Sequence, residues 1–156
     1  MNIPSLGPLT VHPEVKDWLV SQPVAVPYFD NARLTFTLDS LEDSDQVDAR
    51  SAVDSFLGLT VSDRLAVSAA VYGNYTEMAE LVDECDLGCE IATAAEVWEF
   101  VHPTGIFVSR LSYGDKAVYV WIAAECDWEP EHGLQIVYRW GKELSRVSEQ
   151  DGHLVE

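Results

Sequence analysis

Basic residues are scarce in this chain. Its 156 residues include nine Lys and Arg against 27 Asp and Glu, which gives a formal net charge of −18 at pH 7. Nucleic acids and anionic membranes are bound by basic surfaces, so this balance argues against both as partners. It is compatible with a basic protein partner, and equally with acidity that serves only solubility.

Long apolar runs and a secretion signal are also missing. The longest apolar runs are far shorter than the roughly 20 residues that cross a bilayer. The first residues, Met1–Leu6, show no basic segment followed by an apolar one. We therefore expect a soluble, cytoplasmic protein. Since 47% of the residues are hydrophobic, the chain can bury a core, and its length predicts a single domain over residues 1–156.

Cysteines number only three: Cys85, Cys89 and Cys126. An odd count without a secretion signal argues against a disulfide framework. The spacing of Cys85 and Cys89 supplies half a zinc site, but no second Cys/His pair follows at a zinc-finger interval. We therefore expect buried or incidental thiols and no tight transition-metal site.

The first hundred residues combine short strands with helices. Residues 33–39 alternate polar and apolar side chains, which predicts a strand. Residues 49–56 repeat apolar side chains at helical spacing. A second helix is expected to follow Ser62, its N-cap candidate, and to break near Gly73, because glycine costs about 1 kcal/mol relative to alanine inside a helix. A third, short helix is expected over residues 94–101.

From Gly105 onwards the apolar residues recur with a period of two, which is typical of strands. Strands are predicted over residues 106–111, 117–124, 134–140 and 144–148. The second of these is apolar on both faces, so it should be a central, covered strand. Together with the helices before it, this pattern predicts the α+β class, with an antiparallel β-meander packed against two or three central helices.

The most informative stretch of the sequence directly follows the predicted central strand. It places four carboxylates within seven residues, with no Lys or Arg among them, and an imidazole comes next. These residues are Glu125, Asp127, Glu129, Glu131 and His132. Hard oxygen ligands suit Ca²⁺ or Mg²⁺, so one interpretation is a weak divalent-cation site, although the spacing does not match an EF-hand loop. No other cofactor is expected.

A second interpretation of this stretch is a structural charge network. Because residues two apart share one face of a strand, Glu125 and Asp127 should lie on the same face. Arg110, Arg139 and Arg146 fall on the neighbouring predicted strands. We expect these three arginines to neutralise the two acids, in cross-strand pairs worth about 0.2–1 kcal/mol each.

Motifs of catalysis are missing as well. The sequence has no nucleophile elbow, Gly-rich phosphate loop or HExxH motif, so no residue receives a catalytic or cofactor-binding role. An acid–base mechanism would have to pair a carboxylate with His102, His132 or His153. We therefore expect a protein without enzymatic activity, and the alternative is a small metal-dependent hydrolase that uses the loop at residues 125–132.

Acidity is concentrated in the first two-thirds of the chain. Residues 1–104 hold 18 acids and 4 bases, a net charge of −14, whereas residues 105–156 hold 9 acids and 5 bases, a net charge of −4. Such a field speeds the association of a basic protein. The acids expected to bind this partner lie at the first helix and after the second. They are Asp43, Asp45, Asp48, Asp83, Glu84 and Asp86.

Three blocks of the sequence, at residues 97–110, 125–137 and 144–154, resemble an uncharacterised bacterial domain family of small cytosolic proteins. Its members carry similar W-x-F-V-x-P-T-x-I-x-V-S-R, E-C-D-W-E-x-E-H-G-L-Q-L-V-F and R-V-S-x-Q-D-G-H-L blocks. The resemblance covers about residues 9–154, and it brings no established activity with it. The size and acidity of the family are similar to those of immunity-type proteins that are paired with bacterial toxins. From the acidity and this similarity together we expect a non-enzymatic protein-binding domain, an immunity or accessory factor. The partner's identity and the oligomeric state stay open.

Overall fold

The computed structural model describes residues 1–82 and 84–155, with the backbone alone for Glu84 and Cys85. The α-helices are α1 (Gln46–Leu57), α2 (Val61–Ala66), α3 (Ser68–Leu81) and α4 (Glu84–Leu87). Short 3-10 helices are η1 (Pro4–Leu6), η2 (Pro27–Phe29), η3 (Asp43–Asp45) and η4 (Ala94–Phe100). The strands are β1 (Leu9–Val11), β2 (Trp18–Ser21), β3 (Val24–Val26), β4 (Ala32–Leu34), β5 (Phe36–Asp39), β6 (Val101–Arg110), β7 (Val118–Cys126), β8 (Leu134–Arg139) and β9 (Glu143–Ser148).

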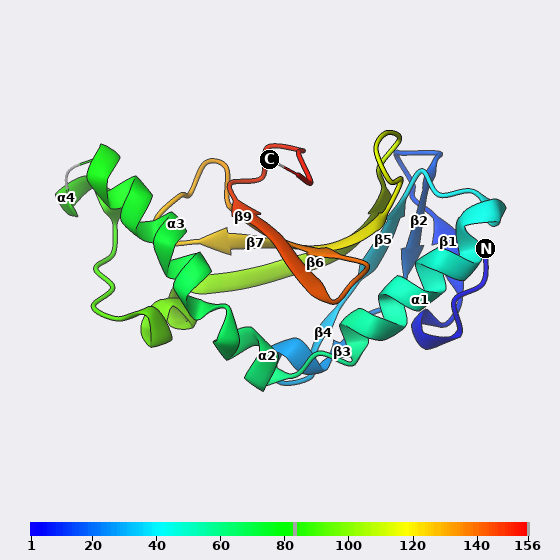
Figure 1. Cartoon of the computed structure of the whole chain (residues 1–156), viewed down its shortest axis with the longest axis horizontal. Coiled ribbons are helices and arrows are strands. Elements are labelled where there is room, and N and C mark those ends of the chain that lie inside the picture. Colours follow the sequence, from blue (N-terminus) through cyan, green and yellow to red (C-terminus); the bar gives the residue numbers. More distant parts are fainter. Residues whose placement is uncertain (83, 156) are drawn as a thin grey trace.

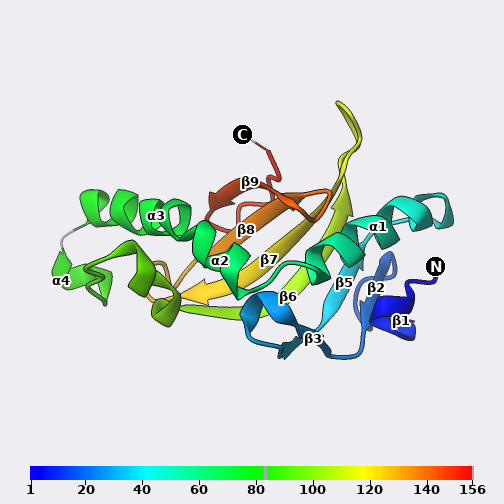
Figure 2. The ribbon, with the colours of Figure 1, turned by 60° about the horizontal axis from the view of Figure 1, so that its bottom comes forward.

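A seven-stranded sheet forms the centre of the fold, with the strand order β1-β2-β5-β6-β7-β8-β9. Strands β6 to β9 are the antiparallel meander that the sequence predicts, so the α+β class is confirmed. The pair β5–β6 is parallel, with Leu38 opposite Val108. Helices α1, α2 and α3 follow one another along one side of this sheet, from the end near the N-terminus to the far end (Figures 1 and 2).

The core lies between the helices and this face of the sheet. Ala49, Val53 and Phe56 of α1 are fully buried, as their helical spacing predicts. The Phe56 ring lies 5.8 Å from the Tyr28 ring and 6.2 Å from the Tyr138 ring, measured between centroids. Helix α1 therefore packs on both η2 and β8. Among the described residues, no helix combines the length and the apolar character that crossing a bilayer requires.

Two predicted elements are divided differently in the structure. The strand expected over residues 33–39 is split at Thr35, because β4 pairs with β3 in a separate two-stranded sheet while β5 joins the large one. The second helix breaks at Val67 rather than at Gly73. There the Ser68 hydroxyl donates to the Leu65 carbonyl at 2.7 Å, and such local bonding competes with helix propagation.

The opposite face of the sheet is partly covered by the C-terminal tail. Leu154 and Val155 pack against a cluster that contains Tyr119 and Val137. The Gln135 amide donates to the carbonyl of His153 at 2.7 Å, which ties the tail to β8. The tail therefore turns back across the last two strands (Figure 1).

Candidate functional site

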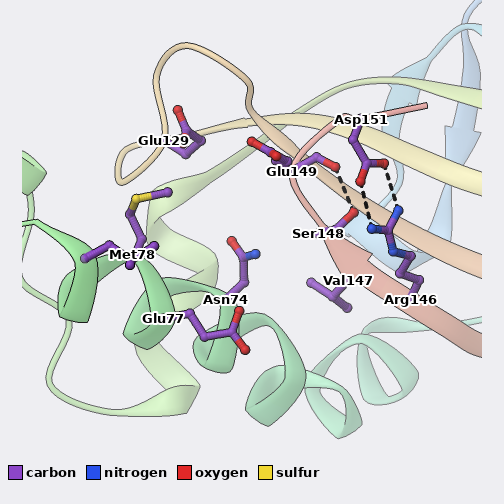
Figure 3. A pocket seen from close by; sticks show the side chains of 10 residues that line it. Asn74, Glu77, Met78, Glu129, Arg146, Val147, Ser148, Glu149 and Asp151 are labelled. Atoms are coloured by element: carbon purple, nitrogen blue, oxygen red, sulfur yellow. Dashed lines mark hydrogen bonds and ion pairs between the residues drawn. The ribbon is translucent and has the colours of Figure 1, made fainter. Parts of the chain in front are cut away.

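A cleft of about 520 Å³ opens between α3 and the end of β9 (Figure 3). Its α3 wall consists of Asn74, Glu77, Met78 and Leu81. Its opposite wall consists of Glu129, Arg146, Val147, Ser148, Glu149 and Asp151. Carboxylates thus stand on both walls, with apolar side chains between them.

Trp128 fixes the loop between β7 and β8 against α3. Its side chain is buried, and its indole N–H donates to the Asn74 side-chain oxygen at 2.9 Å. Its ring also makes an edge contact with the Tyr75 ring, at 5.9 Å between centroids. Because a buried indole is both packed and hydrogen-bonded here, the two walls of the cleft are held in one relative position.

Three side chains near the cleft bring metal-ligating atoms together, and we call Glu129, His132 and Glu149 the Glu-His-Glu cluster. The His132 Nδ1 atom lies 3.5 Å from Glu129 Oε1 and 3.6 Å from Glu149 Oε2. One ligand atom from each residue lies within 4.8 Å of the other two. The backbone N–H groups of Glu131 and His132 donate to Glu129 Oε1 at 3.2 and 3.3 Å, which orients this carboxylate.

The Glu-His-Glu cluster contains two of the five residues that the sequence suggested as cation ligands. Of the other three, Asp127 lies 3.0 Å from His102 Nε2, while Glu125 and Glu131 are exposed outside the cluster. Sequence reasoning missed Glu149. The only available signal was its place next to the conspicuous Gln150-Asp151-Gly152-His153 stretch, since no periodicity shows that the end of β9 returns to this loop.

The arginines expected to neutralise Glu125 and Asp127 lie elsewhere, so that prediction is wrong. Glu125 is near the end of β7, whereas Arg110 and Arg139 are paired with the first two residues of that strand. Arg146 lies on β9, with β8 between it and β7. Side-chain periodicity gives the face of a strand but not its register, and the register decides which charges meet.

All three arginines pair with carboxylates outside the acidic loop. Arg110 Nε lies 3.0 Å from Asp45 Oδ1, and the same guanidinium contacts Asp48. Arg139 forms an ion pair with Asp115 and a longer one, at 3.8 Å, with Glu143. Arg146 forms an ion pair with Asp151 at 2.7 Å. These contacts join α1 to β6, the β6–β7 turn to β8, and β9 to the tail. They are a structural charge network with other members than the sequence suggested.

These pairs also change the expected partner-binding acids. Asp45 and Asp48 are engaged by Arg110, and Asp43 accepts a hydrogen bond from the N-terminal amine at 3.0 Å. The cluster at α1 is therefore partly neutralised within the molecule. Of the acids expected after the second helix, Asp86 is exposed on α4. Asp83 and the side chain of Glu84 lie outside the described residues.

Among the described residues, acids without a Lys or Arg partner gather instead at the end of the molecule formed by α3, α4, η4 and the β7–β8 loop, opposite the end that carries the N-terminus (Figures 1 and 2). We call this region the acidic end. Neither residues 65–109 nor residues 117–138, which contribute to it, contain a Lys or Arg. Its exposed acids are Glu77, Glu80, Asp86, Glu90, Glu96, Glu99, Glu125, Asp127 and Glu131, and Glu129 is half-buried.

The described thiols have no sign of chemical activation. Cys126 is buried, and its burial raises the pKa of the thiol to about 12. Cys89 is half-buried, and burial, with the nearby Asp127 charge, also raises its pKa. A nucleophilic cysteine needs the opposite shift. The side chain of Cys85 lies outside the described residues.

Comparison with known proteins gives a family for this fold. No curated protein and no solved structure matches the chain significantly. A family model described as "Domain of unknown function (DUF6985)" matches residues 5–154. This agrees with the uncharacterised domain family that the three sequence blocks indicate. Since the match spans nearly the whole sequence, the chain belongs to the DUF6985 family of domains of unknown function.

Proposed function

We propose that this protein binds a basic protein partner at its acidic end and catalyses no reaction itself. One observation carries the proposal: the segments that build the acidic end contain no Lys or Arg. By contrast, five of the six arginines, which lie outside these segments, form ion pairs with the chain's own carboxylates. Residues 65–109 and 117–138 therefore carry a net charge of −12, whereas the rest of the chain carries −6.

Solubility alone does not call for this distribution. Like charges gathered at one end repel each other and destabilise the compact state, whereas the same number spread over the surface repel less. A concentrated negative field steers a basic protein towards one face and raises the rate of association. The acidic end is therefore better suited to a specific partner than to general solubility.

The cleft adds apolar contacts to this charge. Leu81 is 79% exposed at the end of α3, and Met78 lies beside it in the cleft wall. Glu77 and Glu80 are exposed on the same helix. An interface of this kind, with apolar anchors inside a charged rim, suits a cationic amphipathic segment. The proposed surface leaves out Asp43, Asp45 and Asp48. The N-terminal amine pairs with the first of these acids, and the Arg110 guanidinium pairs with the other two.

Within this class, we propose an immunity or accessory factor of the bacterial cytoplasm. Small size, acidity and the three sequence blocks support this role by resemblance. The genes beside this one provide a direct check. A neighbouring reading frame for a basic toxin-like protein supports the role, whereas a metabolic operon contradicts it.

A defined basic probe tests the binding surface. The probe is a fluorescent amphipathic peptide of lysine and leucine, and its control replaces every lysine with glutamate. Association rates are measured over a series of salt concentrations by stopped-flow. We expect the basic peptide to bind with a rate that falls as salt rises, because ions screen the steering field, and the acidic peptide not to bind.

Paired variants then locate the surface. Glu77→Gln/Glu80→Gln removes two charges from the acidic end, and Glu14→Gln/Asp17→Asn removes two exposed charges from the N-terminal region. The first variant should slow association by about two- to tenfold and flatten its salt dependence, whereas the second should change it little. Equal effects of the two variants would show that only the total charge matters and would reject the acidic end as the binding surface.

A further inference from the structure

We propose that the Glu-His-Glu cluster binds one first-row divalent metal ion, and that Zn²⁺ is the ion it fits best. The ligands are the His132 Nδ1 atom and one carboxylate oxygen each from Glu129 and Glu149. They come from the β7–β8 loop and from the residue that follows β9. The ligand set and the metal both differ from the weak calcium or magnesium site that the sequence suggested.

The distances in the cluster match ligand spacing better than hydrogen bonding. Zinc bonds to nitrogen and oxygen of about 2.0–2.2 Å place tetrahedral ligands about 3.3–3.6 Å apart. His132 Nδ1 lies 3.5 Å from Glu129 Oε1 and 3.6 Å from Glu149 Oε2. Both separations are longer than an N–H···O hydrogen bond, which spans about 2.7–3.2 Å. Both nitrogen–oxygen separations therefore fit ligands of one shared metal ion, and both are longer than a direct hydrogen bond.

His102 gives a contrast within the same end of the molecule. Its Nε2 atom lies 3.0 Å from Asp127 Oδ1, which is an ordinary hydrogen-bond distance. Of these two histidines, His102 lies at hydrogen-bond distance from one carboxylate, whereas His132 lies at metal-ligand spacing from two. This difference makes His102 a matched control for the proposed site.

The chemistry of the ligands selects the class of metal. Imidazole nitrogen suits zinc and other first-row ions, whereas calcium and magnesium prefer an all-oxygen shell. Two carboxylates and one imidazole leave the fourth tetrahedral position open. The His132 side chain is 57% exposed, so water can fill that position.

Hydrogen bonds hold the two ligand-bearing segments together before any ion binds. The Gln150 N–H donates to the His132 carbonyl at 3.2 Å, and the Gln150 side chain donates to the Ala124 carbonyl at 2.9 Å. Gly133 has a φ of +65°, and a Cβ there would lie 2.6 Å from the Ala124 carbonyl oxygen. The turn after His132 therefore requires glycine, and the loop stays against the end of β9. Backbone segments that are ordered in advance lose little entropy when an ion binds.

Titration with Zn²⁺ alone tests the site. The protein is first stripped of metal with a chelator, and a Cys85→Ser/Cys89→Ser background removes the two cysteines with metal-ligand spacing. Calorimetry at pH 7 should find one zinc ion per chain, and saturating zinc should raise the melting temperature, because the ion binds the native state. Binding should weaken at acid pH, because a protonated imidazole cannot coordinate the metal.

Single variants assign the ligands. His132→Ala and Glu149→Gln should each weaken zinc binding by about tenfold or more, since changing even a residue that only supports a ligand costs about 10–100-fold. His102→Ala and Glu131→Gln remove an imidazole and a carboxylate from the same end, and should change the affinity by less than about twofold. All four side chains are largely exposed, so the variants should fold.

Two results would overturn the proposal. Equal losses in His132→Ala and His102→Ala would assign zinc to the general negative field. An absence of saturable zinc binding would show that the cluster holds only side-chain contacts among Glu129, His132 and Glu149. The Glu77→Gln/Glu80→Gln variant used to test partner binding leaves all three proposed metal ligands unchanged. The metal site and the partner-binding surface can therefore be rejected independently of each other.

Discussion

The hydroxyl oxygens of Tyr28 and Tyr138 lie 2.9 Å apart in the core and join η2 to β8. Both side chains are buried, and their rings meet edge to face at 5.8 Å between centroids. Burial raises the pKa of both phenols, that of Tyr138 to about 12. Both hydroxyls therefore stay protonated at neutral pH, so that one donates and the other accepts.

Removing either of these hydroxyls should destabilise the fold. Tyr28→Phe or Tyr138→Phe leaves the other hydroxyl buried without a partner, which costs about 1–3 kcal/mol. Removing both should cost less than the sum of the two single changes, because no unpaired hydroxyl remains. Urea unfolding of the four proteins measures the coupling, and strict additivity would show that the bond contributes nothing.

Gly141 is expected to tolerate no side chain. Its φ is +73°, and a Cβ there would lie 2.0 Å from the Ala52 carbonyl oxygen in α1. Gly141→Ala should therefore cost more than about 3 kcal/mol, because backbone must move on both sides of the contact. Gly114→Ala is the control, since φ there is +66° but nothing lies within 4 Å of the added Cβ. It should cost only about 1–2 kcal/mol, and equal losses in thermal melts would contradict the close packing of this turn on α1.

Asp151 should make the tail sensitive to acid. Hydrogen bonds from the Arg146 guanidinium lower the pKa of the Asp151 carboxyl below its usual range. Because the pKa of Asp151 is lower in the folded protein than in the unfolded chain, where it is about 3.9, the ion pair stabilises the fold fully at any pH well above 3.9. This stabilisation is lost as the pH falls through the pKa of the folded state. Asp151→Asn should cost about 1–2 kcal/mol at pH 7, and the cost should shrink towards pH 2. Unfolding across this range checks it, with Asp17→Asn as the exposed control; a cost that is independent of pH would contradict the charged pair.

Cys126 should be inert in the native protein. With a pKa of about 12, its thiolate fraction at pH 8 is on the order of 10⁻⁴. Iodoacetamide should therefore leave Cys126 unmodified until the protein unfolds, and peptide mass spectrometry identifies which thiol reacts. Rapid alkylation in the folded state would show that the end of β7 opens to solvent.

The meander and α1 could be predicted from the sequence because their information is local. The period of two from Gly105 gives four strands, and Ala49, Val53 and Phe56 give the buried face of a helix. The parallel neighbour of β6 could not be predicted in this way. Alternation of residues shows that 36–39 form a strand, but it does not show which other strand they meet.

The candidate site could be predicted only in part, for the same reason. Glu129 and His132 stand out because they are close in sequence, whereas Glu149 reaches them only through the path of β9 and the turn after it. The partners of Arg110 and Arg139 depend on register and on the position of α1, which no local pattern contains. Residue types thus indicated metal-ligating and charged side chains, and the fold determined which of these side chains lie close enough to interact.

The parallel pair β5–β6 has a consequence during synthesis on the ribosome. These strands are neighbours in the sheet, yet residues 40–100 lie between them in the chain. At about 5–20 residues per second, translation of that stretch takes roughly 3–12 s. Throughout this interval β5 is an open strand edge that can pair with another nascent chain. The edge can close only after β6 has been made, has left the ribosome and has paired with β5.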